Sequence, residues 1–356
     1  MKASFVVSLL LSLGVSATPA VDTTTIEDGG FTYTGIDKPL LALRGLEARC
    51  DCFPCYSPHA DCSPGKCQCA GDYGCWSCGG GRMQCQPGPG SGHPTTRRHG
   101  KLFPPTPHLP EPNFNGTAYI NGIDLWYATF GPSLETSKRR GLNPVVFLHG
   151  GYANSDYYGH QIRNLQDGLY TLITIDSRAQ GRSGDDPSRP LTYDLMTEDV
   201  VALMDYLKID KFSTVGWSDG GIISFDLAMN YTSRIDRIFS FGGTYSPQNI
   251  NATIDDSPVW TAYMKRVEKE HEHNAPSSVT FEKASKQLNS MWATQPNWDA
   301  TSFAKIPSRY DDDEAPMIWI VDGDYEEAVT RDTPEKLRSW IWGSDLSILP
   351  GVSHFA

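Results

Sequence analysis

Short apolar runs alternate with amphipathic stretches from about Thr117 onward, and this alternation limits the fold more than any other feature of the chain. Buried strands are predicted at 144–148, 169–175, 212–217, 237–241, 317–321 and 346–349, after a hairpin at 117–130 that turns at Asn121-Gly122. Helices are predicted at 192–207 and 219–231. Strands that alternate with helices favour an α/β fold with a mostly parallel sheet and helices on both faces.

The alternation stops between about residues 245 and 313. This stretch is rich in large side chains, among them Trp260, Tyr263, Met264, Trp292 and Trp298. We interpret it as a helical cap inserted over the sheet. Its aromatic residues suit either an apolar ligand or ordinary core packing.

The first twenty residues are typical of a secretory signal peptide. Lys2 provides the positive start, residues 5–15 form an apolar run too short to span a bilayer, and small residues follow at 15–20. No later stretch has the length and apolarity of a membrane span. We therefore expect a secreted protein with no integral membrane span.

All nine cysteines lie between Cys50 and Cys85, in a segment rich in glycine and proline. Such a segment buries too little apolar surface to fold without covalent support, so disulfides are predicted, with zinc as the less favoured alternative. An odd count leaves one thiol free or paired between chains. The expected order is a signal peptide at 1–20, a leader or loosely folded segment at 21–49, the cysteine-rich module at 50–85, a proline-rich linker at 86–112 and the larger α/β domain at 113–356.

The formal net charge of −12 argues against nucleic acid as a partner, because an acidic chain gains nothing from the phosphate backbone. Three Asn-x-Thr triplets predict glycosylation at Asn115, Asn230 and Asn251, which agrees with secretion.

The segment Gly216-Trp217-Ser218-Asp219-Gly220 lies between a predicted strand and a predicted helix. A serine at such a tight turn is strained, and glycines are needed where a side chain would meet the neighbouring backbone. This setting favours Ser218 as a nucleophile presented at the carboxyl end of the sheet. The less favoured interpretation is a serine that only caps the helix.

A serine nucleophile needs a base within hydrogen-bond reach, and the base comes last in the chain order of this arrangement. His354 follows the last predicted strand and is the expected base. His271 and His273 lie in the charged run 265–273, which we expect to be a solvated helix face. The acid that orients the base should follow the preceding strand, where Asp322, Asp324, Glu326 and Glu327 are all candidates.

Two backbone N–H groups are expected to stabilise the oxyanion. One belongs to Asp219, directly after the nucleophile. The other belongs to the loop 149–152, where Gly151 is the first choice and Tyr152 the second. His149 is expected to hold this loop rather than to react.

Together these residues resemble the α/β-hydrolase family over roughly residues 114–356. Residues 176–183 look like its Asp-x-Arg-Gly-x-Gly-x-Ser stretch, with Ala179 in place of a glycine. The elbow is similar to that of biphenyl-hydrolase-like enzymes, including valacyclovir-type ester hydrolases. The match to the family's Gly-x-x-Asp loop implies Glu326 as the acid. The family continues past this histidine into a helix that packs on the sheet. Either that helix is dispensable here or the sequence is truncated, and truncation would leave His354 poorly held.

The leading hypothesis is a secreted serine hydrolase that cleaves a carboxylic ester, or a related acyl bond, of a small molecule through an acyl-enzyme, without cofactor or metal. An aminopeptidase of the same fold is the alternative, with Asp255, Asp256 and Glu268 as candidate partners of an amino terminus. A third hypothesis is an inactive scaffold that docks to a cell-wall polymer or a protein through the cysteine-rich module.

Overall fold

The computed structural model describes residues 23–28, 31–36, 73–78, 82–87 and 104–355. These residues fall into two compact units, one of which begins at Pro104. The other holds two antiparallel hairpins, formed by β1 (Thr23–Asp28) with β2 (Phe31–Ile36) and by β3 (Tyr73–Cys78) with β4 (Arg82–Pro87). The predicted signal peptide, the side chains of all nine cysteines and most of the predicted linker lie outside the described residues.

The larger unit is built on an eight-stranded sheet in the order β12-β11-β10-β9-β7-β8-β6-β5. Its strands are β5 (Phe114–Ile120), β6 (Ile123–Phe130), β7 (Val145–Leu148), β8 (Leu172–Ile175), β9 (Phe212–Trp217), β10 (Ile235–Phe241), β11 (Met317–Tyr325) and β12 (Asp345–Ser353). The strands from β8 to β12 pair in parallel, whereas β6 pairs antiparallel with both β5 and β8. The mostly parallel sheet predicted from the sequence is confirmed.

Each predicted strand lies within or overlaps an observed one, and the expected hairpin turn is present. Asn121 and Gly122 both have positive φ, at 45° and 89°, which is the backbone of the tight turn that Asn-Gly favours. The order of strands also places β9 and β7 at the centre of the sheet. The carboxyl ends of the parallel strands β7, β9, β11 and β12 lie at one edge of the sheet, and the predicted site residues follow these four strands.

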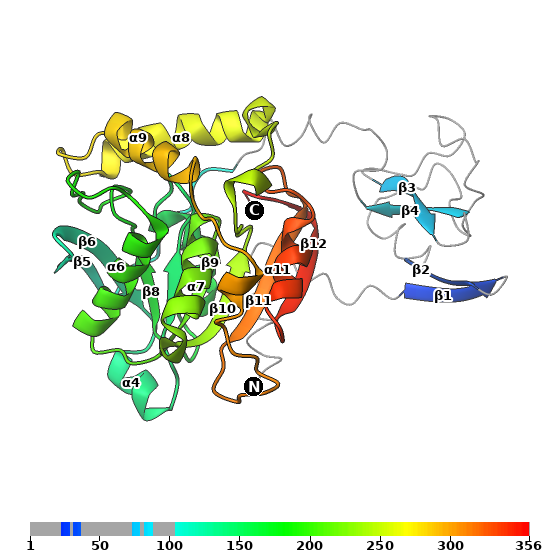
Figure 1. The fold of residues 1–356 in the computed structure, drawn as a ribbon, viewed down its shortest axis with the longest axis horizontal. Coiled ribbons are helices and arrows are strands. Elements are labelled where there is room, and N and C mark those ends of the chain that lie inside the picture. The colour runs from blue at the N-terminus through cyan, green and yellow to red at the C-terminus, as the bar shows by residue number, and fades with distance from the viewer. Residues whose placement is uncertain (1–22, 29–30, 37–72, 79–81, 88–103, 356) are drawn as a thin grey trace. The chain divides into compact units, whose positions relative to one another are not determined.

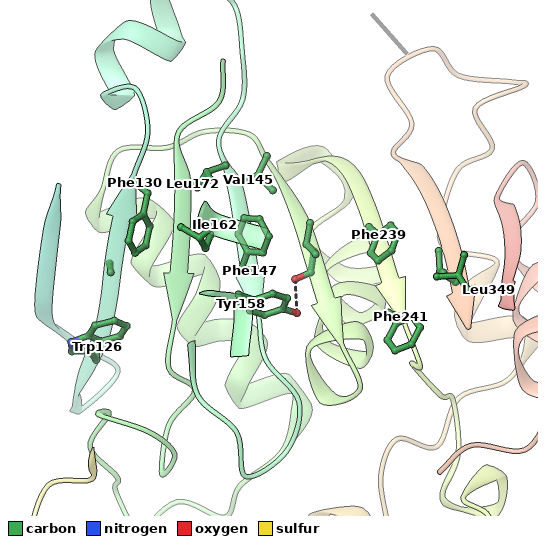
Figure 2. Packing of buried hydrophobic residues seen from close by; sticks show 13 residues of the cluster. Trp126, Phe130, Val145, Phe147, Tyr158, Ile162, Leu172, Phe239, Phe241 and Leu349 are labelled. Carbon is green, nitrogen blue, oxygen red and sulfur yellow. Dashed lines mark hydrogen bonds between the residues drawn. The ribbon is translucent and has the colours of Figure 1, made fainter. Parts of the chain in front are cut away.

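Helices cover the sheet on both sides. The helices α6 (Tyr193–Tyr206), α7 (Asp219–Asn230) and α11 (Thr333–Trp340) lie in front of the sheet in the view of Figure 1. On the opposite face, Tyr158 and Ile162 of the η2–α5 segment (Ser155–Leu165) pack against Phe147, Val215 and Phe239. Figure 2 shows this cluster, in which the Tyr158 hydroxyl donates to the carbonyl of Val215 at 3.2 Å.

The predicted cap is helical. It contains α8 (Pro258–Asn274), α9 (Phe281–Trp292) and α10 (Ala300–Phe303), and Figure 1 shows α8 and α9 above the sheet. The helix α8 begins at Pro258, with the side chain of Ser257 accepting the Trp260 N–H. Within the described ranges, no helix has the length and apolarity needed to cross a membrane.

The segment 104–112, the end of the predicted linker, packs onto this unit. Leu109 contacts the buried cluster on the α5 side of the sheet. Arg163 of α5 donates to the His108 carbonyl at 3.0 Å, and the Thr106 hydroxyl donates to Glu270 on α8. The segment therefore contacts both the α5 side of the sheet and the cap.

Candidate active site

Ser218 occupies a sharp turn between β9 and α7. Its φ of 54° and ψ of −115° lie outside the ordinary regions for a non-glycine residue. The turn is held because the Ser218 N–H donates to the Phe241 carbonyl at 2.8 Å. The strained backbone projects the side chain away from the strand at the carboxyl end of the sheet, which is the geometry of a nucleophile elbow.

Glycines flank the elbow because the backbone leaves no room for Cβ atoms. A Cβ at Gly216 would lie 2.1 Å from the Gly220 carbonyl oxygen. A Cβ at Gly220 would lie 1.9 Å from the Leu148 carbonyl oxygen, on the neighbouring strand. The Gly-x-Ser-x-Gly spacing is therefore a packing requirement of the turn.

Glu326 and His354 form a buried pair. The Glu326 Oε2 atom lies 2.8 Å from His354 Nδ1, and both side chains are at most 5% exposed. The other oxygen, Oε1, accepts the N–H groups of Ala328 and Val329 at 2.7 and 2.9 Å. Burial alone disfavours both charges, but the proximity of the two groups lowers the pKa of Glu326 and raises that of His354.

The other three acid candidates make hydrogen bonds to residues around this pair or to the pair itself. Asp324 accepts the Gly351 N–H at 2.6 Å, and Glu327 accepts the His354 N–H at 3.0 Å. Asp322 is buried and hydrogen bonded to Glu326. Of the four acid candidates, Glu326 is the one whose carboxylate meets the imidazole of His354.

Asp322 behaves as a neutral acid beside Glu326. Burial and the adjacent Glu326 charge raise the pKa of Asp322 to about 8, so its carboxyl proton serves as the hydrogen bond to Glu326. An unfolded aspartate ionises near pH 4. The stabilising contribution of Asp322 is therefore complete below about pH 4 and is lost as pH rises toward about 8.

This linkage predicts the behaviour of Asp322→Asn, which keeps a donor but cannot ionise. The free energies of unfolding of variant and wild type should be similar at about pH 4, and the variant should become the more stable, by more than about 1 kcal/mol, near pH 8. Denaturant unfolding across this pH range measures the difference. Parallel pH profiles for the two proteins would contradict the neutral state of Asp322.

The loop that follows β7 contains one N–H group that points away from the loop's own hydrogen bonds. The Gly150 carbonyl accepts bonds from His149 Nδ1 at 2.7 Å and from the Ala153 N–H at 3.1 Å. Because N–H and C=O point in opposite directions across a trans peptide, the Gly151 N–H points away from these partners. Gly151 lines the cavity that contains Ser218. The N–H of Asp219 belongs to the first turn of α7 and has no intrahelical partner.

The prediction of Tyr152 as an oxyanion donor is wrong in this structure. Its N–H already donates to Gln180 Oε1 at 2.6 Å, and its side chain is buried against α9. The Tyr263 hydroxyl donates to the Gly151 carbonyl at 2.5 Å, so both ends of the Gly151–Tyr152 peptide are fixed. Gly151 and Asp219 are thus the two N–H groups left for an oxyanion.

His149 supports the loop, as the sequence predicts. Its Nε2 accepts the Ser177 N–H at 2.9 Å, so the proton of a neutral ring lies on Nδ1. Burial lowers the pKa of His149, although nearby Asp176 opposes the shift. A neutral imidazole therefore connects this loop to the residues that follow β8.

The side chain of Asp219 connects the elbow to the cap. Its carboxylate accepts bonds from the Tyr193 hydroxyl at 2.7 Å and from Trp292 Nε1 at 3.0 Å. Burial raises the pKa of Asp219 to about 6, against the effect of these donors. Because Trp292 ends helix α9, this carboxylate links the cap directly to the residue that follows Ser218.

A cavity of about 410 Å³ lies between the cap and the end of the sheet. Ser218, Gly151 and His354 line it on the sheet side. Its other walls are mainly apolar and come from the cap and the adjacent loops, including Trp260, Trp292, Ile250, Ile254, Val329 and Phe355. This volume and composition fit a small, largely apolar ligand.

Other predicted residues lie apart from the triad. Asp255 lines the cavity, whereas Asp256 and Glu268 are exposed and lie outside its walls. The expectation of a fully solvated helix face at 265–273 is wrong for His271. Its side chain is buried, and its Nε2 lies 3.0 Å from the Val279 carbonyl oxygen.

Asn115 and Asn230 are exposed and Asn251 is half-buried, so the first two asparagines offer the more open surfaces for a glycan. Among the residues that the structure describes, no group of three His, Cys, Asp or Glu side chains is arranged to hold a metal ion.

Several contacts of the site have no clear sequence signal. Gln180 and Tyr263 fix the oxyanion loop from residues far apart in the chain. Trp217 does have a signal, since it lies inside the elbow motif. Its Nε1 donates to the His354 carbonyl at 2.7 Å.

Comparison with known proteins identifies the fold. Residues 143–301 match the family model described as alpha/beta hydrolase fold. The enol-lactonase of Burkholderia xenovorans LB400 has a similar structure, with a TM-score of 0.50 and 20% identity over 67% of this chain and 92% of that chain. The larger unit of this chain therefore has the α/β-hydrolase fold.

Its relatives include hydrolases. The chain is 33% identical to serine hydrolase BPHL of Homo sapiens over 146 residues, which are 40% of this chain and 45% of that protein. It is 27% identical to 3-oxoadipate enol-lactonase 2 of Acinetobacter baylyi over 162 residues, 46% of this chain and 55% of the relative. Each match thus spans about half of the relative. The resemblance to biphenyl-hydrolase-like enzymes that the elbow indicates is confirmed.

Proposed function

We propose that this chain hydrolyses carboxylic esters of small molecules through an acyl-enzyme formed on Ser218. The observation that carries the proposal is the 2.8 Å contact between Glu326 and the Nδ1 side of His354, in a ring that lines the same cavity as Ser218. With Nδ1–H bound to the carboxylate, Nε2 is left free to accept a proton. The relatives named serine hydrolase and enol-lactonase support the same class of reaction.

The first half of the reaction transfers the acyl group to the protein. Ser218 Oγ attacks the carbonyl carbon of the ester while its proton passes to His354 Nε2. The negative charge on the former carbonyl oxygen is stabilised by the N–H groups of Gly151 and Asp219. The C–O bond to the alcohol then breaks, and the alcohol leaves with the proton from His354.

The second half releases the acid. Water attacks the acyl carbon and gives one proton to His354, which returns it to Ser218 Oγ as the ester to the protein breaks. Glu326 stays ionised and stabilises the imidazolium in both halves. The apolar walls of the cavity favour an apolar or aromatic group on the acyl or alcohol side.

Covalent labelling tests this proposal. A fluorophosphonate probe should react with the folded protein, and peptide mapping should locate the adduct on Ser218. Prior heat denaturation is the control, because an unfolded chain has no activated serine. A folded protein that does not react with the probe would contradict the proposal.

An aminopeptidase of the same fold is the second candidate. One observation favours it: the exposed carboxylate of Asp255 lines the cavity and could bind the ammonium group of a peptide. A panel of neutral aryl esters and amino-acid anilides separates the two activities. We expect the esters to be the better substrates, because the rest of the cavity wall is mainly apolar.

A further inference from the structure

The backbone of His354 lies just beyond the last strand of the sheet. The ladder between β11 and β12 ends with the pairing of Tyr325 and Ser353, so His354 has no ladder partner on β11. Its backbone N–H and C=O groups nevertheless need hydrogen bonds, because His354 is a buried residue. The partners of these two groups determine how firmly the imidazole is held.

Side chains from two elements provide both bonds. Glu327 Oε2 accepts the His354 N–H at 3.0 Å. Trp217 Nε1 donates to the His354 carbonyl at 2.7 Å. The indole of Trp217 is itself fixed by stacking on Tyr157, with ring centroids 5.6 Å apart. The main chain of His354 is therefore held on both sides, by Glu327 from the segment that follows β11 and by Trp217 from the elbow.

We propose that Glu327 is a positioning residue that, together with Trp217, fixes the main chain of His354 and so aims the imidazole at Ser218. This inference rests on the proposed function, because it assigns Glu327 a role in the same reaction. Glu326 fixes the ring through Nδ1, but a single bond to one ring atom leaves the loop free to shift. Bonds to the backbone on both sides of the ring remove that freedom.

Glu327 also contributes charge near the imidazole. His354 faces Asp322, Glu326 and Glu327 from the β11 side and Asp219 from α7. Burial of His354 opposes its protonation, whereas Glu326 and then Glu327 favour it. Removing the charge of Glu327 without removing its acceptor should therefore lower the pKa of His354 but leave the grip on its backbone.

Two variants separate these roles. Glu327→Ala removes the acceptor and the charge, and kcat for an aryl ester should fall about 10–10²-fold with little change in KM, because a small displacement of a catalytic group is costly. Glu327→Gln keeps an oxygen acceptor, and its kcat should stay within about threefold of wild type. In both variants the acidic limb of the kcat/KM profile should move to lower pH. Glu335→Ala, an exposed glutamate on α11, is the matched control.

Titration of His354 by NMR gives a readout that does not require turnover. The His354 resonance is identified by its loss in His354→Gln, and its pKa should fall in Glu327→Gln. A wild type without hydrolase activity but with this shift would refute the proposed function and leave the contact intact. Unchanged kcat in Glu327→Ala would overturn the positioning role, and an unchanged His354 titration in Glu327→Gln would overturn the contribution of the Glu327 charge.

Discussion

Replacing Ser218 by alanine is expected to lower kcat for ester hydrolysis by about 10⁴-fold or more while the fold stays intact. The loss is large because no other hydroxyl can take the position of Ser218 in the elbow, and the remaining groups of the triad act only through the nucleophile. The Ser218 side chain makes no capping hydrogen bond to α7, so its removal costs the helix no cap.

The measurement pairs kinetics with stability. Initial rates on an aryl ester give kcat, and thermal unfolding shows whether the variant keeps the midpoint of the wild type. Ser233→Ala, at an exposed serine outside the site, is the matched control and should be fully active. A Ser218→Ala protein that retains more than about 1% of wild-type turnover would rule out Ser218 as the nucleophile. The inactive-scaffold hypothesis predicts equal, negligible rates for the wild type and for Ser218→Ala.

Replacing Glu326 by glutamine should have the second largest effect, a fall of about 10⁴-fold in kcat. The reason lies in the two oxygens of the carboxylate. Oε1 accepts two backbone N–H groups, from Ala328 and Val329, so the amide oxygen of glutamine will take that position. Its NH₂ group then faces His354 Nδ1, which must lose its hydrogen to accept the bond. The proton moves to Nε2, where the base needs a free lone pair.

Rates on the same aryl ester measure this effect. Glu326→Asp is the companion variant, since it keeps the charge but shortens the side chain by one methylene group. It should be more active than Glu326→Gln at neutral pH, because the tautomer of His354 stays correct. If Glu326→Gln keeps more than about one tenth of wild-type kcat, another carboxylate of the loop orients the base.

The hydrolase fold could be predicted from the sequence because its strands are short, apolar and separated by clear helical patterns. Elements without such a pattern were not predicted. The helix α5 has only seven residues and begins at a glycine, so its apolar periodicity is too short to recognise. It is stabilised instead by packing of Ile162 against the sheet.

The site was predictable where chain order and steric requirements define it, as at Ser218 and His354. The acid could not be chosen from the residues alone, because four carboxylates lie within six positions and a loop decides which one meets the imidazole. Tyr152 failed as a donor because a distant side chain, Gln180, occupies its N–H. Ala179, in place of the family's glycine, adopts a φ of 61° that glycine would adopt more easily.

Residues 328–330, which follow Glu326, pair with residues 249–251 in the first segment of the cap. Ile250 and Val329 form an isolated antiparallel bridge, with the Asn251 N–H donating to the Ala328 carbonyl and the Thr330 N–H to the Asn249 carbonyl, both at 2.8 Å. Ala328 and Val329 are also the residues whose N–H groups hold Glu326. The cap and the carboxylate that orients the base are therefore parts of one hydrogen-bonded unit. A foreign cap grafted onto this domain must bring its own counterpart of residues 326–330.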